Sequence, residues 1–159
     1  MKPFRFGVNV WRAGSRAEWV EKARKIEDLG YGVLTVSDHL ADPFAPMPAV
    51  LSAAEATTTL RVGTNVLNND LRHPVLVARE AATVDVLTDG RLQLGLGAGS
   101  IKSEYDEAGL GFDPGGTRVE RLSEAVTIIK GLLNGEQVTF AGQHYRVTGH
   151  TIAPPPPAR

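Results

Sequence analysis

The chain has 159 residues, a formal net charge of -1, 42% hydrophobic and 22% charged residues, and no cysteine. This is the composition of one ordinary soluble domain, and its near-zero charge gives no reason to expect nucleic acid or an anionic membrane as a partner. The lack of cysteine excludes disulfides, thiolate metal sites and a cysteine nucleophile. The first residues lack the apolar core of a signal peptide, and no apolar run approaches membrane-spanning length, so we expect a cytoplasmic protein.

The first predicted unit is a strand over residues 4–10 followed by a helix. The helix opens with Ser15 and has Glu18 three residues later, which is a capping-box pattern. Gly30 is expected to end it, because glycine adopts the left-handed conformation at low cost.

Two further strands are predicted over residues 33–36 and 60–66, with a short helix opening at Pro48 between them. A long helix then starts at Pro74 and ends in the Asp89-Gly90 turn. Strands that alternate with helices are typical of a parallel sheet with right-handed crossovers.

A fourth strand is predicted over residues 91–97, followed by a loose glycine-rich stretch over residues 98–116. A helix over residues 118–133 comes next. Two short strands, residues 138–140 and 145–147, flank a turn and predict a small hairpin.

Two architectures fit this order: an open doubly wound sheet and an arc of a (β/α)8 barrel. Four units cannot close an eight-stranded barrel, which favours the open sheet. A dinucleotide-binding sheet, however, requires G-x-G-x-x-G after its first strand, and residues 8–11 offer none. The run Gly95-x-Gly97-x-Gly99 has the wrong spacing and follows the fourth strand, so the pattern alone leaves both architectures open.

Ligands of parallel α/β proteins bind at the carboxyl ends of the strands. Polar or glycine residues stand at each of these ends: Asn9, Asp38-His39, residues 64–69 and residues 97–100. Asp38-His39 is the most reactive pair, because a histidine can transfer protons near neutral pH and a neighbouring carboxylate can orient its ring. A helix cap by Asp38 and a hydrogen-bonded loop residue at His39 are the structural alternative.

The remaining candidates also have two interpretations. Asn65 and Asn68 could donate hydrogen bonds to the carbonyl groups of a planar ring, or could form turns. Gly97 and Gly99 could allow a ligand to approach the backbone, or could serve tight packing inside a barrel. His144 has no partner at metal-ligand spacing, and we expect no metal site.

Several short motifs match one family in order and spacing. They are Phe6-Gly7-Val8-Asn9, Thr35-Val36-Ser37-Asp38-His39, Leu60-Arg61-Val62-Gly63-Thr64-Asn65-Val66, Arg72-His73-Pro74 and Gly90-Arg91-Leu92-Gln93-Leu94-Gly95-Leu96-Gly97-Ala98-Gly99. Together they resemble the bacterial luciferase-like superfamily and, within it, the coenzyme F420-dependent oxidoreductases.

The resemblance implies an α/β fold of the (β/α)8 TIM-barrel type, with the first four βα units and a short hairpin present. It implies one domain over residues 1–159, with a proline-rich tail at residues 154–159 where the fifth strand would follow. The implied function is hydride transfer between the deazaflavin F420 and a small organic substrate. An FMN-dependent luciferase-like monooxygenase and a truncated, catalytically silent half-barrel are the alternatives.

The resemblance also implies roles for single residues. In relatives, the Asp-His pair after the second strand lies against the cofactor ring and the histidine takes part in proton movement, which carries onto Asp38 and His39. The third strand of relatives has a bulge, with a non-prolyl cis peptide in several deazaflavin enzymes, which corresponds to Asn65-Val66. The implied cofactor contacts are Asp38, Asn65, Val66, Asn68, Gly97, Ala98 and Gly99.

Two departures from the family pattern set further expectations. Ser100 stands where the related glucose-6-phosphate dehydrogenases have a glutamate that donates a proton, so we do not expect that substrate. Four βα units also present only one wall of the pocket and omit the barrel phosphate site after strands seven and eight. We therefore expect this chain alone to bind deazaflavin weakly and to form a homo-oligomer.

Overall fold

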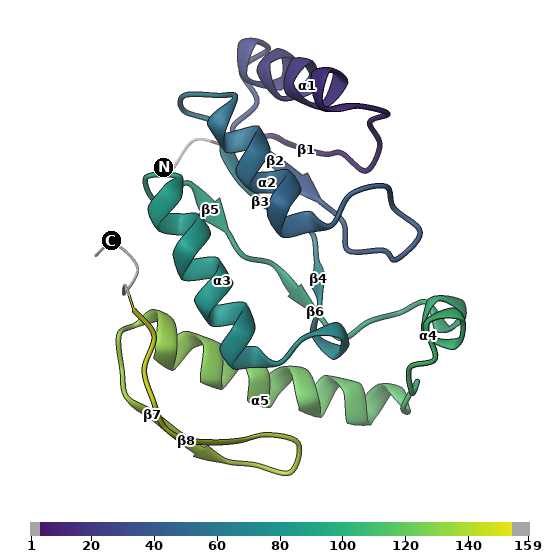
Figure 1. Cartoon of the computed structure of the whole chain (residues 1–159), viewed down its shortest axis with the longest axis vertical. Coiled ribbons are helices and arrows are strands. Elements are labelled where there is room, and N and C mark those ends of the chain that lie inside the picture. Colours follow the sequence, from purple (N-terminus) through teal and green to yellow (C-terminus); the bar gives the residue numbers. More distant parts are fainter. Residues whose placement is uncertain (1–3, 154–159) are drawn as a thin grey trace. The chain divides into compact units, whose positions relative to one another are not determined.

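The computed structural model describes residues 4–153, which divide into two compact units (Figure 1). Unit 1 contains the described residues 4–67 and 87–95, and unit 2 contains residues 68–86 and 96–153. The predicted proline-rich tail, residues 154–159, lies outside the described residues.

Unit 1 is built on a parallel four-stranded sheet in the order β1-β2-β3-β5. The strands are β1 (Gly7–Asn9), β2 (Val33–Val36), β3 (Arg61–Thr64) and β5 (Leu92–Gln93). The register aligns Val8 with Leu34, and Leu34 with Val62. Because all four strands run in parallel, their carboxyl ends lie along one edge of the sheet, which we call the carboxyl edge.

Two helices, α1 (Arg16–Asp28) and α2 (Pro46–Glu55), belong to unit 1. The helix α2 packs on β2 and β3 and lies in front of them in Figure 1. Leu34, Val50 and Val62 are fully buried in this layer. Trp19 of α1 is also buried, and its Nε1 donates to Ala49 O at 3.0 Å.

The Ser15 cap predicted for α1 is confirmed, whereas the Glu18 carboxylate reaches Gly14 rather than the Ser15 backbone of a full capping box. Ser15 Oγ accepts from Glu18 N at 3.2 Å, and Glu18 Oε2 accepts from Gly14 N at 2.6 Å. After the helix, Gly30 has φ 81°, as expected for a glycine that stops a helix.

The predicted third and fourth strands are each interrupted. A cis peptide joins Asn65 to Val66 after β3, and the chain resumes as β4 (Leu67–Asn68). The fourth strand is divided into β5 and β6 (Leu96–Gly97). A Cβ on Gly95 would overlap Thr64 O, so Gly95 serves close packing between neighbouring strands.

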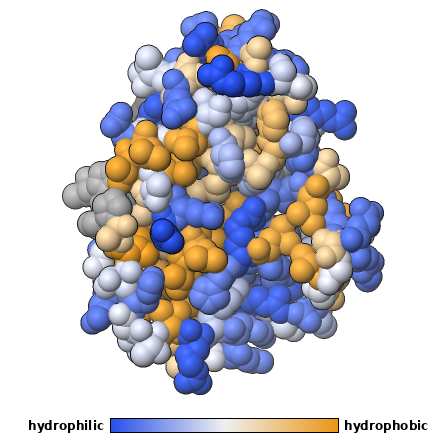
Figure 2. All heavy atoms as spheres, in the orientation of Figure 1, coloured by the Kyte–Doolittle hydropathy of each residue, from blue (hydrophilic) through white to orange (hydrophobic). Residues whose placement is uncertain are grey.

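Unit 2 combines helices with two small sheets. In chain order, its elements are η1 (Asn69–Leu71), α3 (Pro74–Leu87, with its last residue in unit 1), β6, α4 (Lys102–Ala108), α5 (Gly115–Leu133), β7 (Val138–Ala141) and β8 (Arg146–His150). The strand β4 pairs with β6, and β7 pairs antiparallel with β8, which confirms the predicted hairpin. Figure 2 shows hydrophobic side chains at the surface over α3, where Leu76 and Val86 are exposed.

The carboxylate of Glu124 on α5 holds the hairpin turn beside that helix. It accepts from the backbone N–H groups of Gln143, His144 and Tyr145 at 2.7, 3.0 and 3.0 Å. These bonds lower the pKa of Glu124, although desolvation of the carboxylate acts in the opposite direction.

Two helix starts differ from the predictions, and one helix was not predicted. The helix α2 starts at Pro46 rather than Pro48, and α5 starts at Gly115 rather than residue 118. The stretch predicted to be loose contains α4, which an ion pair between Lys102 and Asp106 supports and Gly109 ends in the left-handed conformation. Glycines on both sides of these seven residues made the whole stretch resemble a loop.

No helix within residues 4–153 is long and apolar enough to cross a membrane. The same residues contain no group of three or more histidine, aspartate or glutamate side chains that could hold a metal ion.

Candidate functional site

At the carboxyl edge of unit 1, Asn9 ties the end of β1 to the end of β2. Thr35 Oγ1 donates to Asn9 Oδ1 at 3.0 Å, and Asn9 Nδ2 donates to Ser37 Oγ at 2.9 Å. The backbone continues the pairing, since Val10 N donates to Thr35 O at 2.8 Å. Asn9 therefore fixes the segment that leads to Asp38 and His39.

Asp38 and His39 follow β2 directly and differ in exposure. Ser37 and Asp38 are each only 8% exposed, whereas the His39 side chain is exposed. Asp42 N donates to His39 O at 3.0 Å, so the loop turns back immediately after the histidine. The backbone carbonyl of His39 is thus held by Asp42, while its imidazole stays accessible to a ligand or to solvent.

The Asn65-Val66 segment stands beside the end of β2. Asn65 N donates to Val36 O, and Leu67 N donates to Gly95 O, both at 2.8 Å. The peptide bond between Asn65 and Val66 is cis, as the resemblance implied, and both side chains are exposed. Unit 1 therefore brings an imidazole, an amide and an apolar side chain to the same edge of its sheet.

Residues Asn68, Gly97, Ala98 and Gly99, which we call the unit 2 wall, belong to the other unit. Asn68 is buried, and its Oδ1 accepts from Asp70 N at 3.0 Å. The hydroxyl of Tyr105 lies 2.9 Å from Asn68 Nδ2 and 3.0 Å from Oδ1, so it holds this amide. Burial raises the pKa of Tyr105 even though the hydrogen bond from Asn68 opposes the shift, which keeps its hydroxyl protonated at neutral pH.

Gly99 has a structural requirement of its own. Its φ is 79°, and a Cβ there would overlap the hydroxyl of Tyr105. Gly99 therefore fits the packing interpretation, in an irregular segment that follows β6.

A cluster of charged residues around Ala98 and Gly99 was not predicted from the sequence. Arg118 donates to the carbonyl oxygens of Ala98 and Gly99, and Arg121 bridges Asp70 and Asp113. The hydrogen bond to Asp113 contributes most to raising the pKa of Arg121, and the bond to Asp70 adds to it, although burial of the guanidinium acts in the opposite direction. The three-residue spacing of the arginines, which puts both on one face of a helix, was the available signal.

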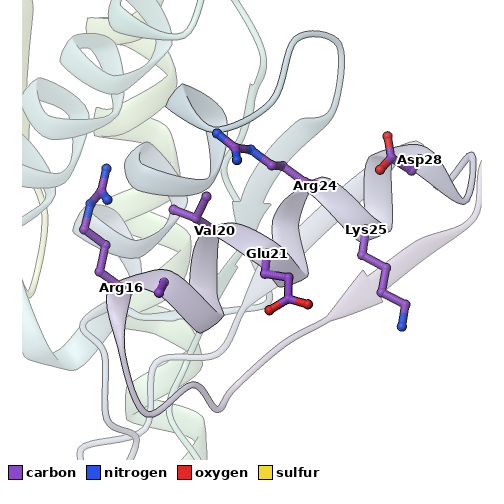
Figure 3. Close-up of a pocket in the computed structure, with 7 residues that line it drawn as sticks. Arg16, Val20, Glu21, Arg24, Lys25 and Asp28 are labelled. Carbon is purple, nitrogen blue, oxygen red and sulfur yellow. The ribbon is translucent and has the colours of Figure 1, made fainter.

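A shallow hollow on the surface of unit 1 is separate from these residues. Figure 3 shows that the side chains lining it all project from α1, among them Arg16, Arg24 and Glu21. The Nε of Arg24 donates to Ala56 O at 3.3 Å. None of the residues at the carboxyl edge lines this hollow.

Two relatives show what the sequence is similar to. Over 135 residues, 82% of this chain and 34% of the relative, it is 38% identical to the 4-hydroxyprotoasukamycin monooxygenase of Streptomyces nodosus subsp. asukaensis. Over 157 residues, 89% of this chain and 47% of the relative, it is 33% identical to an F420-dependent glucose-6-phosphate dehydrogenase of Intrasporangium calvum. The chain thus spans half or less of the length of these relatives.

A solved structure bears out the fold. The coenzyme F420-dependent tetrahydromethanopterin reductase of Methanopyrus kandleri superposes with a TM-score of 0.83 at 24% identity, over 93% of this chain and 45% of the reductase. The fold is α/β, with parallel strands and helices that match part of a TIM-barrel enzyme of the luciferase-like type. Residues 2–159 match the family described as luciferase-like monooxygenase, and the chain belongs to that family.

Proposed function

We propose that this protein is an F420-dependent oxidoreductase that transfers a hydride between the deazaflavin and a small organic substrate. The observation that carries the proposal is the exposed His39 beside the exposed Asn65-Val66 segment at the carboxyl edge of unit 1. Relatives named as F420-dependent enzymes support the choice of cofactor.

The side chains present fit such a cofactor. An accessible imidazole can hold a proton, an amide can pair with ring carbonyl groups, and an apolar side chain such as Val66, 43% exposed, can contact a planar ring. When bound, the deazaflavin supplies the hydride chemistry. The protein binds and orients the ring and moves a proton.

Each residue has a role in this proposal. His39 gives or takes the proton that accompanies hydride transfer, and Asp38 positions it from the buried side of the loop. Asn65 and Val66 contact the ring. The unit 2 wall supplies further cofactor contacts through its backbone and through the amide of Asn68.

An FMN-dependent monooxygenase is the second candidate, because the chain is 38% identical to a relative named as a monooxygenase. A pair of titrations separates the two candidates. Purified chain at high concentration is added to F420 and, separately, to FMN, and the visible absorbance of each chromophore is followed. We expect saturable, weak binding of F420 and weaker binding of FMN.

The control is a pair of asparagine variants. Asn65→Ala should weaken F420 binding, whereas Asn134→Ala, at the end of α5, should leave it unchanged. Preference for FMN would favour the monooxygenase. Binding of neither cofactor would overturn the proposal and favour a catalytically silent chain.

A further inference from the structure

Arg118, at the start of α5, joins two segments of unit 2 that enclose α4. Its Nη1 donates to Ala98 O at 3.2 Å and to Gly99 O, before α4, and its Nε donates to Asp113 O at 3.0 Å, after α4. The guanidinium also stacks on Phe112, with 4.0 Å between its Cζ and the ring centroid. A planar guanidinium with several donors in fixed directions can make these contacts together, whereas a lysine ammonium cannot also provide the planar stacking.

Two aromatic rings hold the guanidinium of Arg118 in place beside Ala98 and Gly99. Phe112 packs edge-to-face on Tyr105 with 4.9 Å between ring centroids, and Tyr105 is almost completely buried. The arginine is therefore held by aromatic packing on one side and by backbone carbonyl groups on the other.

The hydrogen bonds from Arg118 to Ala98 O and Gly99 O set the direction of two backbone N–H groups. In a planar trans peptide the carbonyl and the N–H of the same unit point in opposite directions. The carbonyl groups of Ala98 and Gly99 point to Arg118, so the N–H groups of Gly99 and Ser100 point away from it. Within the described part of the chain, neither N–H group has a hydrogen-bond acceptor.

We propose that Arg118 is a positioning residue that aims the N–H groups of Gly99 and Ser100 at acceptor oxygens of the bound cofactor. This inference rests on the proposed function, because it needs a cofactor at the unit 2 wall. The acceptor is an oxygen of the deazaflavin, on either its ring and ribityl part or its phosphate-bearing tail. Arg118 itself contacts neither cofactor nor substrate and acts only through the backbone of Ala98 and Gly99.

Three variants test the proposal. Arg118→Met removes the donors. Arg118→Lys keeps the charge but loses the planar guanidinium, and it provides the test if the methionine variant fails to fold. Lys130→Met is the matched control, since Lys130 is an exposed cation of the same helix. Each is titrated with F420 and with the deazaflavin riboside that lacks the phosphate tail, and the amide signals of Gly99 and Ser100 are followed by NMR.

We expect Arg118→Met to weaken F420 binding about tenfold or more, Arg118→Lys to weaken it less, and Lys130→Met to match the parent chain. The Gly99 and Ser100 amide signals should shift on F420 binding in the parent chain and shift less in Arg118→Met. An equal loss with the riboside assigns the acceptor to the ring and ribityl part, and a loss only with F420 assigns it to the tail.

Parent-like F420 affinity in Arg118→Lys and in any folded Arg118→Met would overturn the proposal. So would F420 binding that leaves the Gly99 and Ser100 signals unmoved. If the parent chain binds neither F420 nor FMN, the proposed function fails and this inference fails with it. A parent chain that binds F420 equally well with and without Arg118 defeats this inference alone.

Discussion

The carboxylate of Glu27, near the end of α1, holds the segment that leads into β3. It accepts from three consecutive backbone N–H groups: Thr59 at 2.6 Å, Leu60 at 2.9 Å, and Thr58 at 3.0 and 3.1 Å. The Thr59 hydroxyl adds a bond at 3.1 Å. We predict that Glu27→Gln destabilises unit 1, because an uncharged amide oxygen accepts more weakly and an NH2 group would face donors.

The size of the effect follows from the pKa. Desolvation raises the pKa of Glu27, but the N–H groups of Thr59, Leu60 and Thr58 together lower it from 4.5 to about 2. The full shift corresponds to about 3 kcal/mol, and solvent screening at this partly exposed site reduces the expected loss to about 1–2 kcal/mol. A lowered folded-state pKa stabilises the fold above pH 4.5, and this contribution is lost as the pH falls toward 2.

Urea unfolding monitored by the fluorescence of the buried Trp19 measures this difference. At pH 7 the free energy of unfolding of Glu27→Gln should be lower by about 1–2 kcal/mol, and the gap should narrow as the pH falls from 4.5 toward 2. Glu21→Gln, an exposed position on the same helix, is the control and should unfold like the parent chain. If the difference between Glu27→Gln and the parent chain is absent at pH 7, or stays constant down to pH 2.5, the ionised Glu27 carboxylate does not stabilise this segment.

Three other predictions address the turn, the association and the chemistry. Gly99→Ala should destabilise unit 2 by at least about 3 kcal/mol in thermal or urea unfolding, because strain at positive φ adds to the overlap with Tyr105. The control Gly109→Ala, which has a similar φ but open space around the added Cβ, should cost about 1–2 kcal/mol, and equal losses of stability in the two variants would contradict the prediction. Phe6 is 71% exposed next to β1, an edge strand of the sheet, and should support self-association of the chain. Sedimentation velocity should therefore detect oligomers, and Phe6→Lys should reduce their fraction. A parent chain that stays monomeric at all concentrations would contradict this prediction. In a complete relative with the same Asp-His pair, replacing the histidine that matches His39 by alanine should slow turnover about 10²–10⁴-fold with little loss of cofactor affinity; an unchanged rate removes this residue from the mechanism.

The sequence predicted the local features that depend on near neighbours. The Ser15 cap, the strand over residues 33–36, the start of α3 at Pro74 and the hairpin all depend on residues within a few positions of one another. The cis peptide at Asn65-Val66 was expected only from the resemblance, because no single-residue pattern distinguishes it from a continuous strand.

The contacts that shape the unit 2 wall were beyond sequence reasoning. Asn68 and Tyr105 are 37 positions apart, and Arg118 lies 20 positions from Ala98. Hydrogen bonds over such separations exist only after the chain has folded. The glycine-rich composition of residues 98–116 also hid α4, whose aromatic residue organises the surrounding side chains.

The most direct test of the proposed cofactor site is an NMR titration of the uniformly labelled chain with F420, because shift mapping locates even weak binding. The largest changes in unit 1 should fall on the amides of residues 37–40 and 65–67, at the ends of β2 and β3. The α1 hollow, with Glu21 and Lys25, should show no change. Shifts confined to that hollow, or no shifts at the highest F420 concentration, would contradict a cofactor site at the carboxyl edge.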